Sequence, residues 1–87
     1  MTVADAGYEP ANGIYWNIPD INGHHAWKKV GGPYILVDGY TGGWEIRNTV
    51  PNTYENLYDG HPATSAIPIS WIPVGDIGPG PTVTGMV

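Results

Sequence analysis

Glycine and proline interrupt this 87-residue chain so often that little room remains for a helix of ordinary length. The sequence holds 13 glycines and 9 prolines, spread from one end to the other. Both destabilise a helix interior, glycine through its backbone entropy and proline through its missing N–H group. The large apolar residues between these breaks are mainly Ile, Val, Trp and Tyr, which suit a pleated, half-buried strand. The chain is therefore predicted to be all-β.

The clearest strand pattern is a hairpin from Tyr34 to Arg47. An apolar run, Tyr34–Val37, is followed by turn signals at residues 38–39 and 42–43, and then by the alternating segment Trp44–Arg47. Two such runs around a turn are typical of a β-hairpin. Successive strand side chains point to opposite faces, so Trp44 and Ile46 are expected on one face, with Glu45 and Arg47 on the other. The first run is apolar on both faces, which predicts the more central strand.

Three further segments are predicted strands. Residues 14–18 alternate, which favours a strand with Ile14, Trp16 and Ile18 together on one face. Residues 24–30 can pair back onto it after a turn. Residues 67–72 are apolar but contain Pro68, which cannot donate to a ladder and so indicates an edge strand. The predicted fold is a single small antiparallel sandwich or twisted sheet of about five strands.

The two ends of the chain are predicted to extend from this one domain, which spans residues 1–87. Residues 1–11 are expected to form an extended N-terminal arm, and residues 75–87 a C-terminal tail rich in proline and glycine. Both contain few large apolar side chains to hold them on a core. They are expected to be mobile in an isolated subunit and ordered where they contact other copies.

Charge and composition exclude several classes of function. The net charge is −5, so the chain lacks the basic surface that nucleic acids or anionic membranes attract. Residues 1–7 lack the basic region and apolar run of a signal peptide, and no apolar run approaches the roughly 20 residues of a membrane helix. With no cysteine, thiol catalysis and thiolate metal sites are excluded.

No metal or cofactor site is predicted. His24 and His25 are adjacent, so on a strand they should point to opposite faces, and His61 is distant in sequence. Asp20 or Asp59 could complete a zinc site only by accident of folding. Residues 20–23 resemble the start of a calcium loop, but the bidentate glutamate that such a loop requires does not follow, so a turn is the better interpretation.

The sequence also lacks a recognisable catalytic arrangement. Its two serines, Ser65 and Ser70, do not lie in a Gly-x-Ser-x-Gly motif. Glu45 and Glu55 could in principle act as paired carboxylates in glycoside hydrolysis. A domain of this size would struggle to bury and tune them, so the protein is predicted not to be an enzyme.

The aromatic residues are the best candidates for contacts with a partner or a glycan. Tyrosine and tryptophan stack on sugars and anchor protein interfaces. Because the chain has no Phe and two Leu, Trp16, Trp44 and Trp71 are predicted to form the core. The predicted surface contacts, most of which follow turn-rich segments, are His25, Trp27, Tyr40, Tyr54 and Tyr58.

Several short motifs together resemble a small β-rich module that recurs in bacteriophage tail, fibre and other virion-associated proteins. They are Val3-Ala-Asp-Ala-Gly7, Asn12-Gly-Ile-Tyr15, Asn22-Gly-His-His-Ala-Trp27, Tyr34-Ile-Leu-Val37, Gly43-Trp-Glu-Ile46 and Pro79-Gly-Pro-Thr-Val-Thr84. The module more commonly has glycine at the place of Asp5 and proline at the place of His25. Most of these positions are turns or core aromatics, so the resemblance implies a structural or adhesive role and supplies no catalytic residues.

These observations predict a non-enzymatic structural or adhesive module, a subunit of a phage capsid or tail or of another surface assembly. Its expected location is a virion or an extracellular surface, and its expected partners are other protein subunits. The alternative is a carbohydrate-binding module that uses exposed Trp and Tyr side chains, which would need two or three of them in a row.

Overall fold

The computed structural model of the protein describes residues 1–40, 43–49, 56–61 and 67–85, apart from the side chain of Tyr40. Eight strands lie in this part of the chain: β1 (Thr2–Ala4), β2 (Gly13–Ile21), β3 (His24–Lys29), β4 (Tyr34–Tyr40), β5 (Gly43–Asn48), β6 (Asn56–His61), β7 (Ser70–Pro73) and β8 (Thr82–Thr84). One 3-10 turn, η1 (Glu9–Ala11), precedes β2, and no α-helix occurs among the described residues. No helix in this part of the chain is long and apolar enough to cross a membrane.

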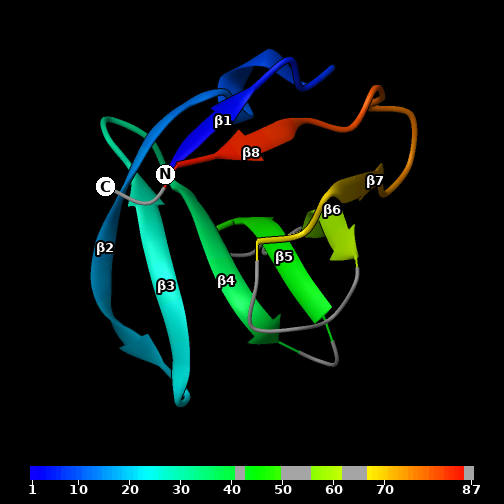
Figure 1. Cartoon of the computed structure of the whole chain (residues 1–87). Helices are drawn as coiled ribbons and strands as arrows, with labels where there is room; N and C mark the ends of the chain where they lie inside the picture. The colour runs from blue at the N-terminus through cyan, green and yellow to red at the C-terminus, as the bar shows by residue number, and fades with distance from the viewer. Residues whose placement is uncertain (41–42, 50–55, 62–66, 86–87) are drawn as a thin grey trace.

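The strands form one antiparallel sheet that curls into a nearly closed barrel (Figure 1). Their order is β7-β6-β5-β4-β3-β2-β1-β8, so β7 and β8 are the two edges that approach each other. The all-β prediction is confirmed. Of the two predicted arrangements, the single antiparallel sheet is observed and the sandwich is not. The predicted count of about five strands is wrong, because β1, β6 and β8 are strands that were not predicted.

Short strands near both ends of the chain, β1 and β8, belong to the barrel wall. β1 lies between β2 and β8, with Val3 opposite Val83, and both valines are buried in the core. The Met1 amino group donates to Tyr15 O at 2.9 Å, and Gly7 N–H donates to Pro79 O at 2.8 Å. The predicted arm and tail therefore do not lie off the core in the described residues. Backbone ladders, together with the buried side chains of Met1, Val3 and Val83, hold these short segments on the core.

The predicted hairpin is confirmed in β4 and β5. Leu36 lies opposite Ile46 and Val37 opposite Glu45, and β4 is a central strand of the sheet. Trp44 and Ile46 point into the core, with 2% and 0% of their surface exposed. Across this hairpin the apolar alternation alone identifies the inner face correctly.

On β2 the predicted inner face is the outer one. Ile14 and Trp16 are 53% and 60% exposed, whereas Tyr15 between them is 1% exposed. The Tyr15 hydroxyl donates to Ala11 O at 2.6 Å, so the buried ring brings no unsatisfied polar group into the core. Because residues 14–16 are all large and apolar, alternation allowed either face, and the prediction that Trp16 is a core residue is wrong.

The core contains two residues that were predicted to reach the surface. Trp27 is 7% exposed and stacks on Trp44, with ring centroids 5.8 Å apart and planes at 13°. Tyr58 is fully buried. Its hydroxyl accepts from Tyr8 N–H at 3.0 Å and donates to Ile77 O at 2.7 Å, so it joins the segments before β2 and after β7. The core positions predicted for Trp44 and Trp71 are confirmed.

Candidate binding surfaces

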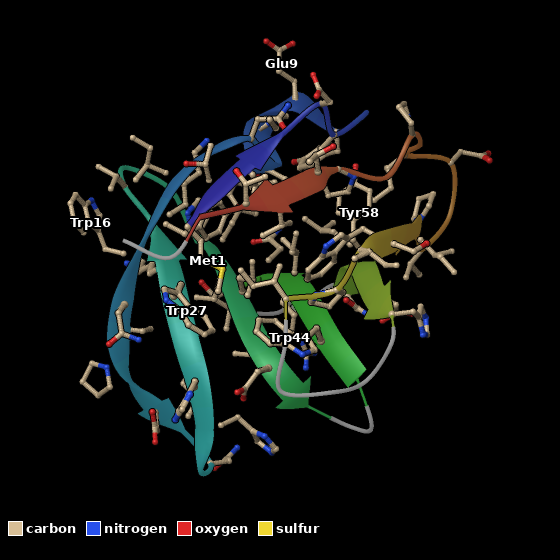
Figure 2. The ribbon with its side chains drawn as sticks, viewed as in Figure 1. Met1, Glu9, Trp16, Trp27, Trp44 and Tyr58 are labelled. Atoms are coloured by element: carbon tan, nitrogen blue, oxygen red, sulfur yellow. The ribbon has the colours of Figure 1, made fainter. Side chains whose placement is uncertain are left out.

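An exposed apolar patch lies on the outer face of β2 and the end of β3. Val30 N–H donates to Ile14 O at 3.0 Å, and Trp16 lies opposite Lys28 in the β2–β3 ladder. Val30 is 55% exposed, which is close to the values for Ile14 and Trp16. Figure 2 shows the Trp16 side chain pointing away from the sheet, on the opposite side of β2 from the barrel interior. We call Ile14, Trp16, Lys28 and Val30 the apolar–basic face.

This face continues across the sheet as a row of apolar and cationic side chains. Lys28 lies opposite Ile35, and Ile35 lies opposite Arg47. Arg47 contacts the Glu45 carboxylate, with Nη1 and Oε1 3.4 Å apart. No carboxylate of the described residues lies within ion-pair distance of Lys28. Lys28 therefore leaves an uncompensated positive charge beside Trp16, in a chain whose net charge is −5.

The outer face of β7 is apolar too, but its charged neighbours are acidic. Ile72 lies opposite Asp59 in the β6–β7 ladder and is 51% exposed. Val74, just beyond the strand, is 46% exposed, and the exposed Asp76 follows it in the same loop. We call Ile72, Val74, Asp59 and Asp76 the apolar–acidic face.

The seam between β7 and β8 is closed at one end and open at the other. It is closed at Gly80, where a Cβ would come within 1.7 Å of Trp71 O. From there it widens into a groove of about 410 Å³, lined by Ile67, Pro68, Ile69, Trp71, Pro81, Thr82, Val83, Thr84 and Gly85. Ile69 at its rim is 92% exposed. The groove is an apolar surface with no charged residue in its described lining.

A smaller pocket of about 270 Å³ gathers polar side chains at the ends of β5 and β6. Its lining includes Glu45, Asn56, Asp59 and His61, and Glu45 lies opposite Asp59 in the ladder. Carboxylates and an imidazole can carry out acid–base chemistry. Here Asn56 Nδ2 donates to Asp59 Oδ1 at 2.5 Å, and Arg47 contacts Glu45. Both carboxylates are therefore engaged by neighbouring side chains of the sheet.

The two adjacent histidines approach a single carboxylate. Asp38 Oδ1 accepts from His25 N–H at 2.9 Å and lies 3.8 Å from His24 Nδ1, while Asp38 Oδ2 lies 3.6 Å from His25 Nδ1. The sequence predicted that the two rings point apart. Instead, both rings come close to the same carboxylate. The two strands that flank this end of β3, β2 and β4, both have register shifts here, and such irregularities redirect side chains. No group of three His, Cys, Asp or Glu side chains suited to a metal ion occurs among the described residues.

The core tyrosines act as structural hydrogen-bonding groups. The hydroxyls of Tyr8 and Tyr34 are 3.0 Å apart and share a hydrogen bond. That bond, with burial, raises the pKa of Tyr34 to about 12. Burial also raises the pKa of Tyr15 well above its usual value. Both remain neutral near pH 7, so neither ring offers a nucleophile or a base at that pH.

The predicted contact residues are not gathered on one surface. His25 is exposed as predicted, whereas Trp27 and Tyr58 are buried and cannot contact a partner. The Tyr40 side chain and the whole of Tyr54 lie outside the described residues. The sequence analysis did not identify Trp16 as an exposed residue. The run Ile14-Tyr15-Trp16 did indicate that one large apolar side chain would face outwards, because it is apolar on both faces of the strand. A strand that is apolar on both faces must cover its second face or expose it.

Comparison with protein-family models, with curated proteins and with solved structures finds no match for this chain.

Proposed function

We propose that the protein is a non-enzymatic structural or adhesive module, one subunit of a virion or of another surface assembly. The observation that carries this proposal is the exposed cluster of Ile14, Trp16 and Val30 on strands whose inner face already builds the core. Contiguous apolar patches on soluble proteins mark interaction sites, and tryptophan is enriched among the residues that dominate binding energy. The resemblance to virion-associated modules supports the same role.

The position of Trp16 suits a binding residue. It lies on the nine-residue strand β2, where Tyr15 is anchored to Ala11 and the ladder to β3 holds the backbone. A side chain on a rigid strand loses little conformational freedom when it binds, so more of its contact energy appears as affinity. A protein partner with an apolar pocket and a carboxylate would match both Trp16 and Lys28.

The test is association with purified particles, from a source that makes the protein, measured by co-sedimentation and electron microscopy. Wild-type protein should bind, and Trp16→Ala should bind about 30-fold more weakly, as expected for a central aromatic contact. Ile69→Ala is the matched control, because Ile69 is even more exposed but lies at the β7–β8 groove. A strictly monomeric protein that is absent from purified particles would contradict the proposal.

Carbohydrate binding through Trp16 is the second candidate. One exposed indole beside a lysine could stack on a sugar, but sugar platforms use several aromatics in a row. Trp16 is the one largely exposed Trp or Tyr among the described side chains, and the nearby Asn17 amide already donates to Ala26 O at 3.1 Å. A glycan array separates the two functions. Sugar binding that is lost in Trp16→Ala would favour the second.

A further inference from the structure

The two apolar faces lie on opposite sides of the barrel. The apolar–basic face is built on β2 and β3, whereas the apolar–acidic face is built on β6, β7 and the following loop. β3 and β7 are separated by three strands in an eight-strand order, which is about half a turn of a nearly closed barrel. Figure 1 shows β2 and β7 at opposite edges of the molecule.

The two faces are complementary in charge and similar in apolar character. Trp16 and Ile14 adjoin the cation Lys28, while Ile72 and Val74 adjoin the anions Asp59 and Asp76. No ion pair engages Lys28 or Asp76 among the described residues. If two apolar–basic faces met, their lysines would come together, and like charges at an interface disfavour the pairing.

We infer that the protein associates with further copies of itself head to tail, with the apolar–basic face of one copy against the apolar–acidic face of the next. This inference rests on the proposed function and names one partner, a second copy of the chain. Each copy uses two different faces, so the contact is heterologous. Such contacts continue into rings or open filaments instead of stopping at a dimer.

Each contact should be small. The whole chain exposes 4868 Å², and a standard interface would cover about 800 Å² on each partner. Each face has two or three large apolar side chains at its centre, which places it at the lower end of that range. Self-association should therefore depend strongly on concentration and should weaken as salt screens the charges.

Sedimentation velocity from about 1 µM to about 1 mM, where weak complexes form, tests the inference. Wild-type protein should form species larger than dimers as concentration rises. Trp16→Ala should weaken association about 30-fold, as expected for a buried aromatic anchor. Lys28→Glu and Asp76→Lys should each weaken it about tenfold by placing like charges across the contact. Circular dichroism and thermal melting establish that each variant keeps the fold.

A charge exchange makes the test specific to the pairing. The double variant Lys28→Glu/Asp76→Lys has the net charge of the wild type and should recover most of the association that either single change loses. Glu9→Lys is the control, because it makes the same charge change as Asp76→Lys at a residue of η1 that belongs to neither face. Figure 2 shows the Glu9 side chain pointing away from the barrel, far from Trp16. Glu9→Lys should leave association unchanged.

Three outcomes would overturn the inference. They are a wild type that stays monomeric at about 1 mM, an association that Asp76→Lys leaves unaffected, and a double variant no better than the singles. The proposed function is judged separately, by Trp16-dependent binding to purified particles. A monomeric protein that still binds particles through Trp16 would keep the proposed function and reject self-association.

Discussion

The β2–β3 and β5–β6 sides of the barrel use the same strand alternation but leave different outer surfaces. On β5 the inner residues Trp44 and Ile46 are apolar, while Glu45 on the opposite side of the strand is itself buried and forms an ion pair with the half-buried Arg47. On β2 the inner Tyr15 is flanked by Ile14 and Trp16, which are more than half exposed. The β5–β6 side buries its large apolar residues in the core, whereas the β2–β3 side also exposes large apolar residues to solvent.

The exposed Ile14 and Trp16 side chains contribute little to the stability of the isolated fold. A side chain contributes hydrophobic free energy in proportion to the apolar area that it removes from water. Trp44 is 2% exposed and stacked on Trp27, whereas Trp16 is 60% exposed. Trp44 therefore contributes to the stability of the fold, whereas Trp16 is available to a partner.

Replacing these two tryptophans gives the largest expected difference. Trp44→Ala should lower the free energy of unfolding by about 3–5 kcal/mol, because it removes a buried aromatic and leaves a cavity beside Trp27. Trp16→Ala should change it by no more than about 0.5 kcal/mol. Urea unfolding followed by circular dichroism measures both. Equal losses would show that Trp16 belongs to the fold and would remove the basis of the proposed binding face.

The buried tyrosine hydroxyls extend the comparison. Tyr58→Phe on β6 leaves both Tyr8 N–H and Ile77 O without their partner, so it should cost about 1–3 kcal/mol. Tyr15→Phe on β2 leaves only Ala11 O and should cost about 0.5–1.5 kcal/mol. Both changes keep the ring, so differences in urea midpoint report the hydroxyl bonds. A larger loss of stability in Tyr15→Phe than in Tyr58→Phe would contradict this ranking of the two hydroxyls.

Alkaline unfolding should report Tyr34 on β4. Its pKa is raised to about 12 in the folded protein, against about 10 in an unfolded chain. Above about pH 10 the unfolded state loses its proton first, so stability should fall as pH rises towards about 12. The slope for one group is at most about 1.4 kcal/mol for each pH unit. Melting temperatures from about pH 8 to 11 measure it, and Tyr34→Phe should flatten the fall. If stability falls with pH equally steeply in Tyr34→Phe, the alkaline destabilisation comes from another group.

The fold class and one hairpin could be predicted from the sequence because their evidence is local. Gly and Pro spacing excluded long helices, and the alternation in Trp44–Arg47 identified its inner face. The strands at the two ends could not be predicted this way. Thr2–Ala4 and Thr82–Thr84 are three residues each. Thr82–Thr84 becomes a strand by pairing with Thr2–Ala4 across nearly the whole chain, and Thr2–Ala4 also pairs with β2.

The exposed apolar face of β2 was missed for a related reason. Ile14, Tyr15 and Trp16 offer two apolar faces, and the choice between them depends on Ala11, whose carbonyl accepts the Tyr15 hydroxyl. No pattern within residues 14–18 contains that contact. Trp27 and Tyr58 were misplaced in the same way. Both lie near turn-rich sequence but contact residues that are distant in the chain, Trp44 for Trp27 and Tyr8 and Ile77 for Tyr58.

The smallest expected effect concerns Asp38, which lies beside the histidines at the far end of β3. Asp38→Ala removes the acceptor of His25 N–H and should cost about 0.5–1.5 kcal/mol. Asp38→Asn keeps an oxygen acceptor and should cost less, so the pair separates the hydrogen bond from the carboxylate charge. Thermal melting measures both variants. If Asp38 only caps the local backbone, particle binding and self-association through the apolar–basic face should be unchanged in both. Loss of either in Asp38→Asn would extend that face to this end of the β2–β3 hairpin.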